Sequence, residues 1–207
     1  MSINQELRTF LKTNFNGLTV KQPLFYNWPT GLRFNLQTTS PDKEEYFDEV
    51  IKRTTTLFAK TFDLTDNLFI VFIQFKWKRR KIRFRNYFFK QIKGLNKREI
   101  DYKRITRLYE KNDIDDIWNV ATIKATADRL NYNETFRAIA NTDFSREPNI
   151  PGQVYLINVD KKIIFNMYDD RGLDIISTDK EVLKPLYAAF DNWLLDYDRD
   201  EMKKRFE

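Results

Sequence analysis

Three short apolar segments near the end of the chain have the length of β-strands. They cover residues 154–159, 163–168 and 173–176, and polar connections of three and four residues join them. Connections this short leave no room for a crossover, so successive strands must be antiparallel. The pattern therefore predicts a three-strand meander. An apolar stripe of helical period from Leu183 to Tyr197 predicts a helix after it.

Pro185 lies inside this helical stripe. Proline lacks a backbone N–H, and its ring clashes with the preceding turn of a helix. We therefore expect a short turn before Pro185 and the main helix after it.

Helical periods also occur earlier in the chain. Residues 3–12 follow Ser2, and Gln5 stands at the spacing of a capping box. Residues 40–62 begin with Ser-Pro, a pair that favours a helix start, and residues 134–142 form a shorter apolar stripe. We expect one helix in each of these three segments.

Apolar runs and alternations predict three further strands, at residues 32–36, 68–77 and 118–127. The segment between the last two is ambiguous. Ile82 and Phe84 alternate with basic residues, which favours another strand, whereas residues 88–95 have helical spacing. No repeat, low-complexity tract or Gly/Ser linker divides the sequence.

The order of these elements predicts an α+β fold. We expect a single domain over residues 1–207, with a central, mainly antiparallel sheet packed against helices. The three-strand meander and its following helix complete the expected domain at the C-terminal end.

Composition excludes several kinds of catalysis. The chain has 207 residues and a net charge of +6, but no Cys and no His. Thiol nucleophiles, His general bases and Cys or His metal sites are therefore excluded. We expect no cofactor. The first residues lack the pattern of a signal peptide, and the longest apolar run has six residues, so we expect a cytoplasmic protein without a membrane span.

Basic residues are concentrated in residues 76–107. This segment holds 14 Lys and Arg and two acids, a net charge of +12, whereas the rest of the chain carries −6. A solvated strand edge, an acidic protein partner and a nucleic acid would each explain the excess. Trp, Tyr and Arg dominate interface hot spots. The candidate interaction residues are Trp28, Trp77, Lys78, Arg79, Arg80, Lys81, Arg83 and Arg85.

An acidic turn joins the last two expected strands. Its candidate structural residues are Asp169, Asp170, Arg171, Gly172 and Asp174. We favour a purely structural turn, in which Gly172 supplies a positive φ and Arg171 pairs with a carboxylate. Three carboxylates are also ligands that suit Mg²⁺ or Ca²⁺, so a metal site here is the alternative.

The sequence resembles a bacterial family catalogued as a domain of unknown function. The resemblance rests on the C-terminal string YDDRGLDII, with LY, W and DYDR after it, and on FYNWPTGLRFNL and FKWKRRKIRF earlier in the chain. It covers most of the chain, which implies a single domain. It implies no catalytic residues.

The strand–turn–strand–helix ending is also similar to that of proteins that protect bacteria from their own toxins. We therefore expect a non-enzymatic protein-interaction module, with a toxin-neutralising immunity protein as its most concrete form. One alternative is a nucleic-acid-binding protein that uses residues 76–107, and another is a carboxylate-dependent metal enzyme at residues 169–174. The oligomeric state is left open.

Overall fold

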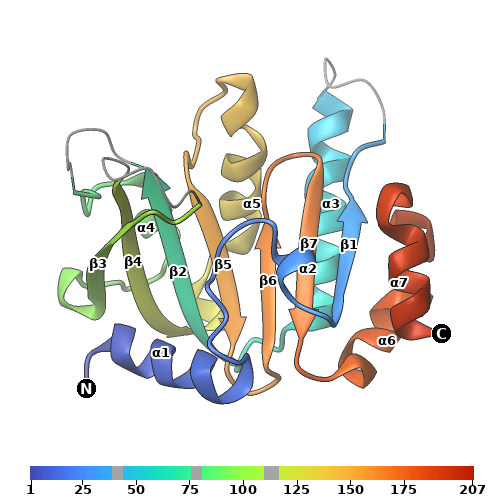
Figure 1. Ribbon diagram of the computed structural model, residues 1–207. Coiled ribbons are helices and arrows are strands. Elements are labelled where there is room, and N and C mark those ends of the chain that lie inside the picture. The colour runs from blue at the N-terminus through green and yellow to red at the C-terminus, as the bar shows by residue number, and fades with distance from the viewer. Residues whose placement is uncertain (39–43, 76–80, 110–116) are drawn as a thin grey trace.

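One antiparallel sheet organises the molecule (Figure 1). The structure, a computed structural model, describes residues 1–38, 44–75, 81–109 and 117–207. Within these residues seven strands lie in the order β1-β7-β6-β5-β2-β4-β3. Their bounds are β1 Gly31–Asn35, β2 Asn67–Phe75, β3 Ile100–Thr106, β4 Ile117–Thr126, β5 Gln153–Asn158, β6 Ile163–Met167 and β7 Gly172–Ser177.

Helices cover both faces of the sheet. In Figure 1, α3 and α5 lie behind it, α1 and α2 lie in front, and α6 and α7 flank β1. The helices are α1 Ile3–Asn14, α2 Leu24–Asn27, α3 Glu44–Thr61, α4 Tyr87–Lys90, α5 Tyr132–Ala140, α6 Lys180–Ala189 and α7 Arg199–Phe206. The chain therefore has the α+β fold that its sequence predicts.

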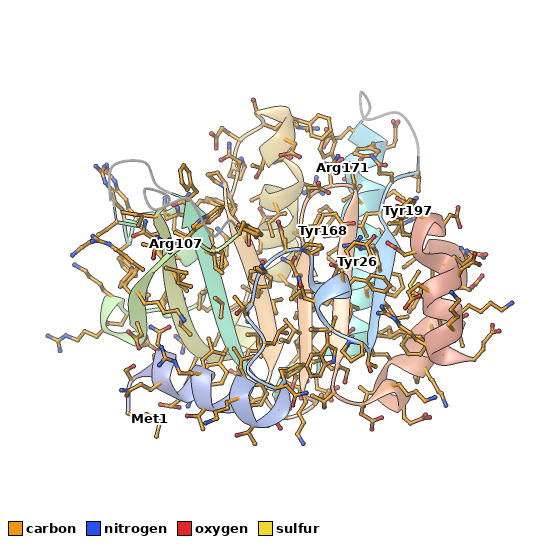
Figure 2. All side chains as sticks on the ribbon, in the orientation of Figure 1. Met1, Tyr26, Arg107, Tyr168, Arg171 and Tyr197 are labelled. Atoms are coloured by element: carbon orange, nitrogen blue, oxygen red, sulfur yellow. The ribbon has the colours of Figure 1, made fainter. Side chains whose placement is uncertain are left out.

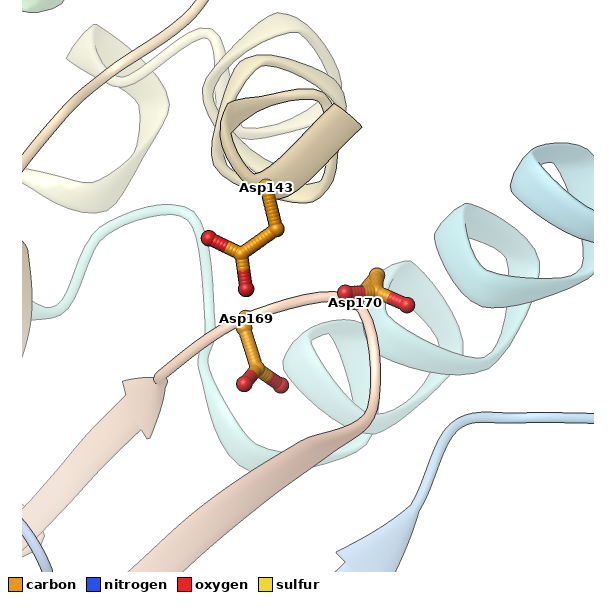
Figure 3. A group of neighbouring side chains, drawn as sticks. All are labelled: Asp143, Asp169 and Asp170. Carbon is orange, nitrogen blue, oxygen red and sulfur yellow. The ribbon is translucent and has the colours of Figure 1, made fainter. Parts of the chain in front are cut away.

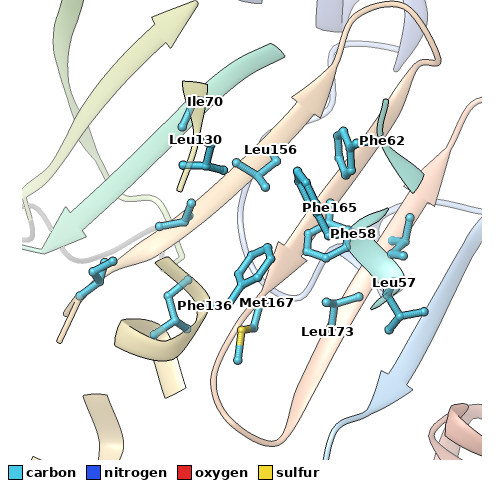
Figure 4. Close-up of a cluster of buried hydrophobic side chains, with 14 of the residues drawn as sticks. Leu57, Phe58, Phe62, Ile70, Leu130, Phe136, Leu156, Phe165, Met167 and Leu173 are labelled. Carbon is cyan, nitrogen blue, oxygen red and sulfur yellow. The ribbon is translucent and has the colours of Figure 1, made fainter. Parts of the chain in front are cut away.

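Aromatic side chains fill the core between the sheet and the two helices α3 and α5 (Figure 4). Phe58 of α3 stacks on Phe62 with ring centroids 4.6 Å apart. Phe136 of α5 lies 5.7 Å from Phe165 of β6. Removing such a side chain from water stabilises the fold by about 1.5–3 kcal/mol, so this layer fixes α3 and α5 on the sheet.

The meander of β5, β6 and β7 is confirmed, and every one of its strand pairs is antiparallel. The strands expected at residues 32–36, 68–77 and 118–127 are found as β1, β2 and β4. Trp77 and the start of the second expected helix lie outside the described residues.

The segment around Ile82 and Phe84, whose pattern was ambiguous, contains no strand at residues 81–86. Ile82 lies in irregular backbone and Phe84 in a turn, and the strand of this region is β3, which the pattern did not single out. Ile82 is buried although no strand contains it, because its segment packs against the core. An alternation of two apolar residues did not distinguish such a turn from a strand.

The interruption expected at Pro185 is also wrong. Helix α6 runs through Pro185 and ends at Ala189, well before Tyr197. The carbonyl that Pro185 leaves without a donor belongs to Glu181, which is exposed, so water can replace the missing N–H. Short 3₁₀ turns follow, and Leu194 then pairs with Phe34 of β1.

The two edges of the sheet differ. The backbone N–H of Leu195 donates to the carbonyl of Arg33, so residues 194–195 cover the outer edge of β1. The opposite edge is β3, which pairs with β4 and with no other strand that the structure describes. No helix in the described parts of the chain is long and apolar enough to span a bilayer.

Candidate interaction site

A basic groove of about 840 Å³ runs beside β3, on the face of the sheet that α3 and α5 cover. It lies between β3 and the turns that follow residue 80. Its lining residues are Lys81, Ile82, Arg83, Phe84, Lys97, Tyr102, Lys103, Arg104 and Asn119. We call it the basic groove.

Buried apolar side chains hold the wall formed by residues 81–84. Ile82 is 5% exposed and points into the core, which leaves Lys81 and Arg83 exposed on either side. The next helix, α4, begins where the side chain of Asn86 accepts a hydrogen bond from the Phe88 backbone N–H. Phe84 stacks on Phe89 with centroids 6.2 Å apart. This packing fixes the position of the two cations.

Strand alternation builds the opposite wall. Tyr102 and Arg104 lie opposite Ala121 and Asn119 of β4, on the face that carries the core of α3 and α5. Successive side chains of a strand point to opposite faces, so Lys103 starts on the face of α1. Its long side chain lines the basic groove and a second groove on that other face.

Four cations of the basic groove have no counter-charge among the described residues. Lys81, Arg83, Lys97 and Lys103 form no ion pair with any residue that the structure describes. The nearby Arg129, in contrast, holds Glu99 at 3.1 Å. Burial and the charge of Arg8 lower the pKa of Lys103, and Asp101 opposes this only in part. A negatively charged ligand would therefore be favoured here.

The structure brings together only part of the predicted interaction set. Lys81 and Arg83 line the basic groove, and Arg85 is exposed beside it. Four predicted residues lie outside the described residues: Trp77, Lys78, Arg79 and Arg80.

Trp28, the remaining candidate interaction residue, does not line the basic groove. It is half-buried on the face of α1, where its Nε1 donates to the Ser177 carbonyl at 2.7 Å. Its ring packs 5.1 Å from Phe15. The indole therefore packs against the smaller core cluster on the face of α1.

Sequence reasoning counted Lys97, Lys103 and Arg104 as part of the charge but did not single them out, and it missed Tyr102. In the structure the side chains of Ile100–Thr106 alternate between buried or half-buried and exposed, but the residue types of this segment do not alternate between apolar and polar. Tyr102 and Arg104 share one face of that alternation. Without the register between β3 and β4, the sequence could not place that face beside Lys81.

The acidic turn forms the connection between β6 and β7. Arg171 donates through Nε to Asp169 at 2.9 Å, as expected of a structural turn. The positive φ expected at Gly172 is wrong, because this residue has the extended backbone of β7. Glycine is needed there for space, since a Cβ would overlap the ring of Tyr168.

Asp169 and Asp170 of this turn face Asp143, which follows α5 (Figure 3). One carboxylate oxygen from each of the three residues lies within 4.8 Å of the others. Asp170 is buried and accepts a hydrogen bond from the hydroxyl of Tyr46. Burial raises the pKa of Asp170, and the hydrogen bond from Tyr46 opposes the change.

Asp174 does not belong to this acidic group. It lies inside β7 with no exposed surface and binds Arg33 of β1, with Nε to Oδ1 at 2.7 Å and Nη2 to Oδ2 at 3.1 Å. Arg33 also holds Asp198 at 3.2 Å. A chain of polar contacts thus links β7, β1 and the start of α7, and it removes Asp174 from any site at the turn.

Aromatic rings surround the buried guanidinium. Tyr26 and Tyr168, labelled in Figure 2, have ring centroids 4.6 and 5.6 Å from Arg33. The Tyr26 hydroxyl donates to Asp198 at 2.8 Å. Each charged group in this network therefore has a partner, which is the role of a structural network rather than of a reactive site.

The described residues thus define an α+β protein with a basic groove beside β3. The family model described as "Domain of unknown function (DUF3885)" matches residues 7–198, and the chain belongs to this family. The chain is similar to the uncharacterized protein YnaE of Bacillus subtilis (strain 168), with 26% identity over 91% of this chain and 96% of that protein. No solved structure matches the chain.

Proposed function

We propose that the protein binds an acidic protein partner through the basic groove and acts by occlusion rather than by chemistry. The observation that carries this proposal is that Lys81, Arg83, Lys97 and Lys103 gather in one groove and have no ion pair among the described residues. A bacterial toxin neutralised in the cytoplasm is the most concrete partner, in agreement with the analogy to immunity proteins.

Physical chemistry supports an acidic partner. Like charges gathered in one groove repel each other, and burial already disfavours the charged form of Lys103. Carboxylates from a partner would remove both penalties. Complementary charge also accelerates encounter and selects against other partners. Tyr102 and Phe84, 40% and 39% exposed, supply aromatic surface of the kind that interfaces use.

A charge-reversal experiment tests the proposal. The full-length protein and a Lys81→Glu/Arg83→Glu variant are used to capture partners from the host lysate. The matched control is Lys60→Glu/Lys180→Glu, which makes the same change in net charge at two exposed lysines remote from the groove. We expect a stoichiometric acidic protein with the wild type and the control, and its loss with the groove variant. Recovery of no protein, or equal recovery by all three, would contradict the proposal.

A nucleic acid is the second candidate, because Phe84 and Tyr102 expose aromatic rings beside the cations. Bases stack on such rings while cations neutralise phosphates. This function predicts binding of a labelled single-stranded oligonucleotide that weakens steeply with salt and with Phe84→Ala. The absence of a complex at low salt would remove it.

A metal enzyme at residues 169–174 stays a prediction. It would have to use Asp143 with Asp169 and Asp170, since Asp174 binds Arg33. A rise in melting temperature on addition of Mg²⁺ or Ca²⁺, lost in Asp143→Asn, would support it, because a ligand of the native state stabilises that state.

A further inference from the structure

The edge formed by β3 has no second strand partner among the described residues, where β3 pairs only with β4. Helix α1 lies on one face of β3, and near the start of the strand Asn4 donates its backbone N–H to the Asp101 side chain at 2.8 Å. The opposite edge, β1, is covered by residues 194–195. The protein thus shields one edge of its sheet and leaves part of the other as a template for pairing.

Both faces beside this edge are basic. On one face lies the basic groove, with Lys81, Arg83 and Lys97. On the other face a second groove of about 470 Å³ lies between α1 and β3, and it includes Arg8, Lys12 and Lys103. A strand added beside β3 would therefore project its alternate side chains toward positive charge on both sides.

We propose that an extended, acidic segment of the partner protein adds to β3 as an eighth strand of the sheet. This inference rests on the proposed function and specifies its geometry. Main-chain hydrogen bonds to the outer edge of β3 supply affinity, and carboxylates on alternate residues, directed into the basic groove, supply specificity. The residues between the carboxylates project onto the other face of the sheet, toward the second groove.

Charge favours an acidic segment over a second copy of the chain as the occupant. Pairing of two β3 edges centred on Lys103 and Arg104 would place these residues of one copy against the same residues of the other, which is unfavourable for like charges. The acidic residues of the C-terminal region cannot serve instead, since Asp191, Asp196 and Asp200 lie in 3₁₀ turns and in helix α7. An acidic strand from another protein would neutralise the basic residues beside β3 and pair with its backbone.

The experiment uses the full chain and a defined probe. The probe is an acetylated and amidated octapeptide in which Glu alternates with Val. Two isomers carry backbone N-methyl groups on all Val or on all Glu residues. Successive N–H groups of a strand point to opposite sides, so each isomer blocks one edge of the peptide and keeps its charge.

We expect the two isomers to differ in Kd by at least about tenfold, because several main-chain hydrogen bonds are lost in only one of them. Backbone amides of residues 102–106 should exchange more slowly with deuterium when the unmodified peptide is bound. Lys81→Glu/Arg83→Glu should weaken binding of the unmodified peptide, whereas Lys60→Glu/Lys180→Glu should leave it unchanged.

The outcomes separate this inference from the proposed function. Equal affinity of the two isomers, with binding still lost in the groove variant, would overturn strand addition and leave binding by charge. Binding that the groove variant leaves unchanged, or no binding of the peptide at all, would overturn strand addition and count against the basic groove as the site. A tight complex with an oligonucleotide that leaves β3 amide exchange unchanged would assign the groove to the second candidate.

Discussion

The guanidinium of Arg33 is a buried charge surrounded by carboxylates and aromatic rings. It has two carboxylates, Asp174 and Asp198, and the rings of Phe25, Tyr26 and Tyr168 around it. A buried ion pair adds little net stability over an apolar pair, but the loss of one partner leaves the other charge unpaired in the interior. The network therefore fixes how β1, β7 and α7 meet.

Replacement of Arg33 should be strongly destabilising. We expect Arg33→Met to lower the free energy of unfolding by about 3–5 kcal/mol, because Asp174 remains buried without its partner. Urea denaturation measures the effect. The double variant Arg33→Met/Asp174→Leu should recover more than about 1 kcal/mol of this loss. A double variant as unstable as the sum of its single changes would refute the coupling.

Asp66 should make stability depend on pH. Burial would raise its pKa, but hydrogen bonds from the Asp63 backbone N–H, Lys161 and Asn158 together lower it below 3.8. The native state thus holds the proton less tightly than the unfolded state, so this contribution is present above 3.8 and is lost as the pH falls through the native pKa.

The variant Asp66→Asn isolates that contribution. The difference in unfolding free energy between the wild type and Asp66→Asn should be largest near neutral pH and should shrink under acid. Denaturant titrations at a series of pH values measure it. A difference that is constant across the range would mean that the Asp66 carboxylate is not the group responsible.

At the scale of elements, the β6–β7 hairpin needs a glycine at residue 172 for space and not for an unusual backbone conformation. Gly172 has an extended backbone, and the space where its Cβ would lie is filled by the ring of Tyr168. That ring also covers Arg33, with its centroid 5.6 Å from the guanidinium. The hairpin and the buried network are therefore packed as one unit.

A methyl group at residue 172 should disturb both the hairpin and the buried network. We expect Gly172→Ala to destabilise the protein by about 1–3 kcal/mol, because the ring of Tyr168 must shift. Thermal or urea unfolding measures the loss. The same substitution in a Tyr168→Leu background should cost less. An equal cost in both backgrounds would place its origin elsewhere.

Elements whose signal is local could be predicted from the sequence. The meander follows from two short connections, and the start of α1 follows from the capping box of Ser2 and Gln5, which is present. Strand β3 could not be separated from its basic surroundings by pattern alone. The contacts of Asp174 and Asp198 with Arg33 span 141 and 165 positions, so no local pattern could reveal them.

At the scale of the whole molecule, the two ends of the sheet have different roles. The β3 end carries the basic groove, whereas residues 194–195 and α7 close the β1 end. The closing segment is anchored by Leu194, Met202 and Phe206, which are at most 7% exposed. The β1 edge of the sheet is thus covered, whereas the β3 edge has no second strand partner among the described residues.

Removal of residues 194–207 should uncover the outer edge of β1. The truncated protein would lose three buried apolar side chains and expose the outer edge of β1, so we expect its melting temperature to fall by about 10 °C or more. We also expect self-association, measured by size-exclusion chromatography, because an uncovered strand pairs with other chains. Leu194→Ala, which keeps the backbone cover, should be milder. A monomer of unchanged melting temperature would refute this role.

The order of strands also has a consequence for synthesis. β1 is made more than 130 residues before its pairing partner, β7, and its cover at residues 194–195. Until those residues have left the ribosome, Leu32 and Phe34, buried in the native state, have no native partner strand. The nascent chain should therefore expose an apolar segment during that interval, which makes it a natural client for chaperones that bind exposed apolar stretches.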